Sequence, residues 1–273
     1  MKRALLFLNT LWLLAACDTT SDVLTTDYRP VVEAYLVADH TVSIHISKEI
    51  PYGGDTSTGV AEDIDGLTVK ITNNAKTYTL KGTGAGIYTS DLVIKTGQTY
   101  QLSFDYNGKA ISATTLVPSR PVNYKESATS ISRAKVDLSG GGFPTGGIGT
   151  DETTPITLTW DNPSNDYHFV VVDNIETSPI AIVTLPSTVP VRNFRFRNEP
   201  VTGTSAELRP QQFQYFGRHR VVLFKINPDY AALYKTNNTS SQNITTPPTE
   251  IQNGLGIFTG VNADTLYLQV RQK

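Results

Sequence analysis

Cys17 is the residue of this sequence with the most distinctive chemistry, because no other cysteine is present. A thiolate is the nucleophile that forms thioethers and disulfides, and a lone one rules out an intramolecular disulfide framework. Lys2 and Arg3 open the chain, and an apolar run of about a dozen residues leads from them to Cys17. The run is too short to span a bilayer, which needs about 20 apolar residues. Positive charges followed by a short apolar run are typical of a secretory signal peptide.

The four residues 14–17, Leu-Ala-Ala-Cys, resemble the lipobox of bacterial lipoproteins. In such signals the cysteine sulfur receives a diacylglycerol, the chain is cut before the cysteine, and the new amine is acylated. The resemblance predicts a signal peptide over 1–16, lipid on Cys17 and a lipid-anchored tether over 17–29. Stable attachment takes more than one lipid chain, which this modification supplies. A buried core cysteine is the alternative interpretation.

The histidines do not form a pattern that predicts a metal site. His40 and His45 are five residues apart, so on a regular strand they point to opposite faces. His168 lies between two aromatic residues in a predicted strand. Arg218 and Arg220 flank His219 and would repel a cation. We therefore expect no metal ion.

The paired acids and the known catalytic motifs give no stronger signal. Asp63 with Asp65 and Asp151 with Glu152 stand in glycine- and threonine-rich stretches, as solvated loop acids do. A calcium site at the first pair would need at least five further oxygens. The sequence has no Gly-x-Ser-x-Gly elbow, no His-Glu-x-x-His helix and no phosphate loop. We predict a protein that is not an enzyme and takes no cofactor, with a calcium site or an acid–base pair as open alternatives.

Arginines are concentrated in one part of the chain, and we take them as a candidate partner or ligand patch. Phe194 and Phe196 alternate with Arg195 and Arg197, so a strand here would have one aromatic and one cationic face. An edge strand protected by charge is one interpretation. A patch for an acidic partner, a carboxylate ligand or lipid headgroups is the other. The six arginines between residues 192 and 220 are Arg192, Arg195, Arg197, Arg209, Arg218 and Arg220.

The elements that position these residues are predicted to be β-strands. A chain of 273 residues with 39% hydrophobic and 18% charged residues can bury a sizeable core. A net charge of −2 argues against a nucleic-acid partner. Residues 41–47 alternate strictly between polar and apolar, and Asn107-Gly108 is the favoured turn between strands at 99–106 and 109–117. We expect an N-terminal β-sandwich of immunoglobulin-like or transthyretin-like kind over 30–118.

The remainder, 119–273, is predicted to be a second, fibronectin-like β domain. Its strands are predicted at 156–160, 167–172, 194–197, 220–226 and 265–270. A glycine-rich loop occupies 139–149, and one short helix begins at Pro228 with Asn227 as its N-cap. The predicted fold class is therefore all-β, with two β-sandwich-like domains and one short helix.

Several short strings along the chain are distinctive in their residues. The most specific string includes Asn253, Gly254, Leu255, Gly256 and Phe258. Glycines so close together indicate strained backbone or close packing. The other strings are 30–36, 86–88, 99–102, 158–160, 226–230 and 247–248. Together these strings resemble those of an uncharacterised family of Bacteroidota outer-membrane lipoproteins, domain of unknown function 4249.

The resemblance implies an accessory lipoprotein, because members of that family are typically encoded beside TonB-dependent outer-membrane receptors. It implies nutrient uptake, with ligand capture or a receptor as partner, and carries no catalytic residue. We expect lipid anchoring at the outer membrane, at the cell surface or on the periplasmic face. The expected partners are the membrane, through the lipid on Cys17, a TonB-dependent receptor and a small ligand of unspecified class. An independent surface lipoprotein that binds glycans or peptides is the alternative.

Overall fold

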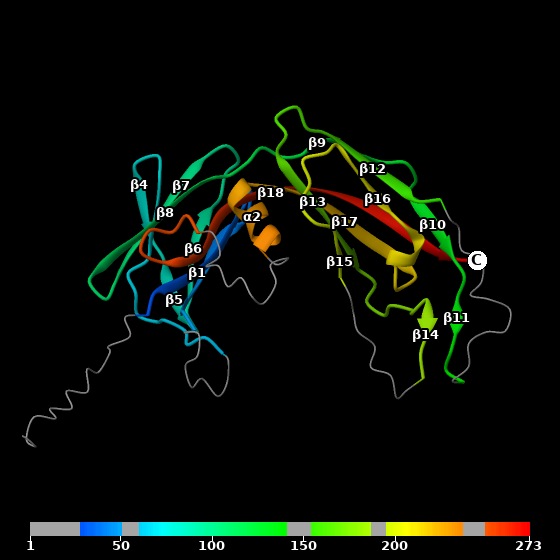
Figure 1. Cartoon of the computed structure of the whole chain (residues 1–273), viewed down its shortest axis with the longest axis horizontal. Coiled ribbons are helices and arrows are strands. Elements are labelled where there is room, and N and C mark those ends of the chain that lie inside the picture. The colour runs from blue at the N-terminus through cyan, green and yellow to red at the C-terminus, as the bar shows by residue number, and fades with distance from the viewer. Residues whose placement is uncertain (1–27, 51–59, 141–153, 187–194, 237–248) are drawn as a thin grey trace, which may run out of the picture.

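The computed structural model describes residues 28–50, 60–140, 154–186, 195–236 and 249–273 (Figure 1). Cys17, Arg192, the acids Asp151 and Glu152, and most of the predicted glycine-rich loop lie outside these ranges. The described strands form four sheets.

The largest sheet runs through both halves of the molecule. Its strands follow the order β15-β13-β17-β18-β1-β2-β6-β5, and β10 also pairs with β18. The bounds of these nine strands are β1 Pro30–Val37, β2 Thr41–Lys48, β5 Lys81–Gly84, β6 Ile87–Val93, β10 Ser130–Arg133, β13 Tyr167–Asn174, β15 Phe196–Arg197, β17 Gly217–Ile226 and β18 Leu255–Gln272.

Three smaller sheets complete the described β structure, in the orders β4-β3-β7-β8, β16-β12-β9 and β11-β14. Their strands are β3 Lys70–Asn73, β4 Lys76–Thr79, β7 Thr99–Tyr106, β8 Lys109–Leu116, β9 Val122–Glu126, β11 Val136–Asp137, β12 Ile156–Asp161, β14 Val183–Thr184 and β16 Ser205–Leu208. The helical elements described are the α-helix α2 (Pro228–Thr236) and the 3-10 helix η2 (Pro210–Gln212). No described helix has the length and apolar character needed to cross a membrane.

Strand β18 belongs to both halves. Residues 255–261 pair in parallel with β1, and residues 261–270 pair antiparallel with β17. In Figure 1, β18 runs from the N-terminal strands to the C-terminal strands as one red ribbon. The two halves therefore share a continuous hydrogen-bonded strand.

Each half has its own core between two sheets. The first core includes Ile44 from the large sheet and Leu102 from β7. The second includes Leu223 from the large sheet and Leu158 from β12. The prediction of an all-β chain with two β-sandwich-like domains and one short helix is confirmed for the described residues. The predicted boundary at residue 118 falls after β8, but Ile251 and Phe258 also pack in the first core.

The clearest local patterns fold as expected. Asn107 and Gly108 both have positive φ, 48° and 74°, and connect β7 to β8. In β2, Val42, Ile44 and Ile46 are buried, whereas Thr41 and Ser43 are exposed and His45 is half-buried; Ser47, at the end of the alternation, is buried as well. Period-two alternation was sufficient to predict this strand because one face of the sheet meets a core and the other meets water.

One expectation needs correction, and one is confirmed with an added role. The predicted closing strand at 265–270 is only the last part of β18, which begins ten residues earlier. Asn227 stands at the N-cap position as predicted, since its carbonyl accepts from Ala231 N at 3.2 Å. Its side-chain Nδ2 also donates to the carbonyl of Leu116 at 2.9 Å and to Thr115 Oγ1 at 3.1 Å. The asparagine thus ties the start of α2 to β8.

Candidate functional site

The candidate site lies on the face of the large sheet that is turned away from the second core. Successive side chains of a strand point to opposite faces. In β13, Val170 and Val172 lie in the second core, and Phe169, Val171 and Asp173 point the other way. The neighbouring strands place further side chains on this opposite face, among them Tyr35, Arg197, Arg220, Val222, Phe224 and Val261.

These side chains line an open space of about 570 Å³, which we call the cleft. Its floor is apolar, and the rings of Phe169 and Phe224 stack there with centroids 4.9 Å apart. Tyr230 of α2 meets Phe169 edge-on at 5.9 Å and Tyr35 of β1 at 5.2 Å. The cleft is therefore built from strands of both halves of the chain and from helix α2.

Arginines form the opposite side of the cleft. The two carboxylate oxygens of Asp173 take separate partners: Oδ1 accepts from Arg195 Nε, and Oδ2 accepts from Arg220 Nη2 at 2.9 Å. The Asp173 side chain is only 12% exposed, whereas that of Arg195 is 67% exposed. Arg197 lies over the ring of Tyr234, with its guanidinium carbon 4.7 Å from the centroid. A cation–π contact orients an arginine without cancelling its charge.

Tyr35, which lines the cleft, and Tyr234, which supports Arg197, have pKa values above the usual range. Burial raises the pKa of Tyr35 to about 12, and the neighbouring Tyr230 and Glu33 add to the effect. Burial also raises the pKa of Tyr234, again with Tyr230 as a contributing neighbour. A neutral phenol can donate a hydrogen bond to an anion, which a phenolate cannot.

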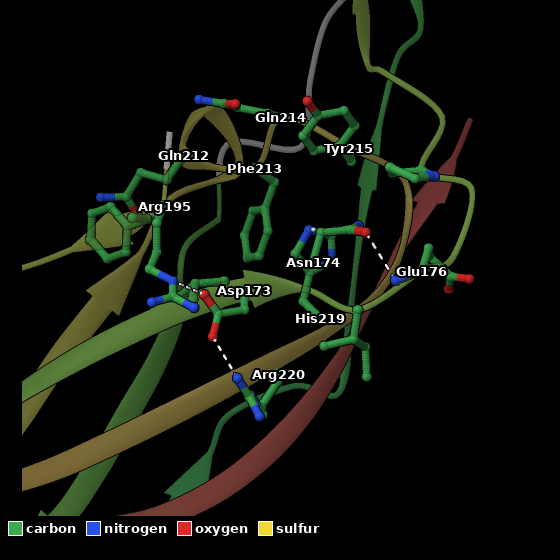
Figure 2. A pocket seen from close by; sticks show the side chains of 14 residues that line it. Asp173, Asn174, Glu176, Arg195, Gln212, Phe213, Gln214, Tyr215, His219 and Arg220 are labelled. Carbon is green, nitrogen blue, oxygen red and sulfur yellow. Dashed lines mark hydrogen bonds and ion pairs between the residues drawn. The ribbon is translucent and has the colours of Figure 1, made fainter. Parts of the chain in front are cut away.

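A second pocket of about 370 Å³ adjoins the cleft and shares Asp173, Arg195 and Arg220 with it. Figure 2 shows Asp173 between the two arginines, with dashed lines to both. The polar groups of this pocket are engaged in holding the chain together. Glu176 Oε1 accepts from Arg218 N at 2.6 Å, and Asn174 Nδ2 donates to the carbonyl of Phe216 at 3.1 Å. We therefore regard the cleft as the better candidate for a ligand.

The structure brings three of the six predicted arginines together and leaves the others elsewhere. Arg195, Arg197 and Arg220 line the cleft. Arg218 lies over the ring of Tyr267, 4.2 Å from its centroid. Arg209 lies near Glu207, with 3.9 Å between nitrogen and oxygen, and Arg192 is outside the described residues. Strand β15 with Arg197 is also an edge of the large sheet, so edge protection and cleft lining coexist there.

The string from Asn253 to Phe258 occupies a structural position at the start of β18. The Asn253 side chain donates to the carbonyl of Ala110 at 2.8 Å, and Phe258 is buried in the first core. Gly256 pairs with Val32 and has φ +95°, and a Cβ on it would lie 2.1 Å from the Val32 oxygen. This close approach of β18 to β1 explains why glycine is required there.

The other titratable candidates do not converge. Asp63 Oδ1 lies 2.8 Å from His45 Nε2, whereas Asp65 Oδ1 accepts from Gly86 N at 3.0 Å. The two acids thus serve different partners. Within the described ranges, no group of three or more His, Cys, Asp or Glu side chains could hold a metal ion.

The two buried histidines predict a pH-dependent stability. Burial lowers the pKa of both His168 and His219. In each, Nδ1 lies 3.1 Å from a backbone carbonyl, and Nε2 of His219 faces the amide nitrogen of Asn174, itself a donor. Since the unfolded chain then binds protons before the folded one, stability is full above about pH 6.5 and falls as the pH drops below it.

We expect the urea midpoint of unfolding to decrease from pH 7.5 to pH 5.5. The double variant His168→Gln/His219→Gln, compared at the same two pH values, should lose most of this decrease. His40→Gln, at an exposed position, is the matched substitution and should retain it. A decrease of equal size in the double variant would show that other groups carry the pH dependence.

Sequence reasoning missed the aromatic floor of the cleft and the pairing of Asp173. The available signal was the uninterrupted apolar runs at 169–172 and 221–224, which alternation does not explain. A strand that is apolar on both sides is buried on both faces. Tyr35 and Tyr230 carried no comparable signal, because they are distant in sequence from β13.

Comparisons with solved structures found chains that are similar at low scores. The FN1-FN3 domains of chicken CNTN1 are similar at 9% identity and a TM-score of 0.21, with 89% of this chain and 66% of that chain covered. This chain thus spans slightly less than two thirds of that one. The fibronectin(III)-like modules of CbhA from Clostridium thermocellum are similar at 11% identity and a TM-score of 0.23, with 89% and 95% covered. Scores this low carry no argument about fold or function.

The sequence comparisons place the chain in a family. Curated protein sequences gave no match. The family model described as "Domain of unknown function (DUF4249)" matches residues 19–266, which include nearly every strand described above and all described residues of the cleft. The chain therefore belongs to the DUF4249 family.

Proposed function

We propose that this chain is a non-enzymatic, lipid-anchored accessory protein of a TonB-dependent nutrient-uptake system at the outer membrane. In this role it captures a ligand for the receptor or binds the receptor itself. The observation that carries the proposal is the cleft, a cavity of ligand size with an apolar floor and a cationic side. The lipobox-like residues 14–17 support the anchoring part of the proposal, and the family membership supports its outer-membrane setting.

The composition of the cleft supports binding in preference to catalysis. No serine, threonine or cysteine is among its described lining residues, so it offers no hydroxyl or thiol nucleophile of these kinds. Its one carboxylate, Asp173, has both oxygens engaged as acceptors from Arg195 and Arg220.

Co-purification tests the proposal. An affinity tag at the C-terminus of the full chain, extracted from native membranes in mild detergent, should bring down a TonB-dependent receptor in near-stoichiometric amount. An unrelated outer-membrane lipoprotein with the same tag is the control. Recovery of the tagged chain without any receptor would count heavily against the proposal.

The anchor is tested separately by replacing Cys17 with alanine. We expect the variant to lose metabolic labelling by fatty acid and to move from the membrane fraction to the soluble fraction, because the acyl chains supply the attachment. Thr19→Ala, two residues along the predicted tether, is the matched control and should keep both. Membrane retention of unlabelled Cys17→Ala would show that something other than lipid holds the protein.

An independent surface protein that binds glycans or peptides is the second candidate. The exposed ring of Tyr35 beside Tyr230 at the mouth of the cleft favours it, since such rings pack against sugar faces and apolar side chains. Calorimetry with glycan and peptide panels, in the absence of any receptor, separates the two. Protease accessibility on intact cells then distinguishes the cell surface from the periplasmic face.

A further inference from the structure

The cleft has two chemically different sides, and this difference defines the ligand that would fit it. The floor side chains Phe169, Val171, Val222 and Val261 are buried, at 4%, 7%, 7% and 3% exposure. The small area that they leave open, together with the half-buried Phe224 and Tyr230, is apolar, so an apolar body matches this floor better than a polar one. A fully polar occupant such as a sugar would leave its hydroxyls unpaired on this floor.

The arginine side carries excess positive charge. Three guanidinium groups line the cleft, and Asp173 is the only carboxylate among its described lining residues. One carboxylate neutralises one guanidinium, so a formal excess of two positive charges remains. The like charges of the three guanidinium groups repel one another. A bound anion would reduce this repulsion, whereas a bound cation would increase it.

The arginines are also held in place before any ligand arrives. Asp173 fixes Arg195 and Arg220 through separate oxygens, and the ring of Tyr234 supports Arg197. A guanidinium presents a planar fork of donors that matches carboxylate and phosphate oxygens. Side chains already oriented lose less freedom on binding, which favours affinity.

We infer that the cleft binds an organic anion with an apolar body. Its carboxylate or phosphate group contacts Arg195, Arg197 and Arg220, and its hydrocarbon or aromatic part lies on the floor of Phe169 and Phe224. This inference rests on the ligand-capturing role proposed above and names the class of ligand. A volume of about 570 Å³ is in the range of small-molecule sites.

A pair of fluorescent probes tests the inference directly. 1-Anilinonaphthalene-8-sulfonate is an aromatic anion, and N-phenyl-1-naphthylamine has the same rings without the sulfonate. The full mature chain with Cys17→Ala is used, since detergent is itself amphipathic and would compete for the cleft. We expect the anion to bind at least about tenfold more tightly than the neutral probe, as hydrogen bonds to charged groups allow.

Arginine variants locate the binding. Arg197→Gln and Arg220→Gln should each weaken binding of the anionic probe about tenfold and leave the neutral probe within about twofold. Arg218→Gln is the matched control, because Arg218 lies on the same strand two residues from Arg220 but outside the lining of the cleft. It should leave both probes unchanged. A melting temperature recorded for each variant separates lost binding from lost folding.

Displacement then identifies the anionic group. 4-Phenylbutyrate and 3-phenylpropyl phosphate carry the same phenylpropyl body with different charged groups, so the one that displaces the anionic probe at lower concentration identifies the preferred group. 4-Phenylbutanol should displace poorly. Equal affinity for the two fluorescent probes, or equal loss in Arg218→Gln and Arg197→Gln, would overturn the inference.

The outcome is distinguishable from that of the receptor experiment. Receptor co-purification without selectivity for the anionic probe would leave the accessory role standing and reject the ligand class. Selective anion binding without a receptor would instead favour a protein that binds such anions independently of any receptor.

Discussion

Replacing Gly256 with alanine is expected to destabilise the protein by roughly 3–5 kcal/mol. Two effects add. The residue has φ +95°, which an L-residue adopts only with strain. Its Cβ would also lie 2.1 Å from the carbonyl oxygen of Val32, where β18 pairs with β1. Backbone cannot move aside there without breaking the ladder that joins β18 to the first half.

Gly84→Ala is a matched control for this prediction. Its φ is +94°, nearly the same as that of Gly256, but a Cβ there would meet nothing within 4 Å. We expect a loss of about 1–2 kcal/mol from backbone strain alone. Urea unfolding followed by fluorescence measures both values, and the difference between them isolates the clash with Val32. Equal losses in the two variants would mean that β18 and β1 separate easily.

Replacing Phe169 with alanine is expected to cost about 3–5 kcal/mol of stability, the usual range for a buried phenylalanine. Its ring is 4% exposed and stacks on Phe224 at 4.9 Å, with Tyr230 and Tyr234 at 5.9 and 6.2 Å. The substitution leaves a cavity among side chains drawn from β13, β17 and α2. The neighbours are held by their own strands and helix, so the cavity closes only in part.

Tyr267→Ala provides the comparison for Phe169. Tyr267 is 48% exposed and meets Arg218 across its ring, so we expect a loss of about 1 kcal/mol or less. Urea or thermal unfolding of both variants measures the contrast. A loss below about 1 kcal/mol for Phe169→Ala would show that the floor of the cleft is not a packed cluster, and would weaken the case for a preformed site.

Period-two alternation made much of the fold predictable. In the predicted strand at 156–160, Ile156, Leu158 and Trp160 alternate with threonines, and all three are buried in the second core. The Asn107-Gly108 turn followed from the conformational tolerance of those two residues. Both patterns depend on interactions within a few residues or on contact with one core, which a local reading of sequence captures.

The length of β18 could not be predicted in the same way. The stretch from Gly256 to Asp264 includes glycine and asparagine at positions 256, 260 and 262, which disfavour strands. It becomes a strand because distant backbone approaches it closely: Val32 at Gly256 and Leu116 at Gly260. Tertiary pairing here overrides local propensity.

The candidate site was predictable only in its charged part. The density of arginine between 192 and 220 was visible in the sequence, and three of those side chains line the cleft. The aromatic part joins the stacked Phe169 and Phe224 to Tyr35 in β1 and Tyr230 in α2, and their meeting depends on how β1, β18, β17 and β13 pair. A surface assembled from strands so far apart in sequence has no local signature.

The shared strand β18 has a consequence for the order in which the chain folds. The first half contains β1 and most of its own core, yet it lacks Ile251, Phe258 and the parallel partner of β1 until residues 251–261 have been made. Contacts between such distant segments close slowly, because the intervening chain must first lose freedom. The N-terminal half is therefore expected to reach its native state only after these residues have been synthesised, and its edge at β1 needs protection from other chains until then.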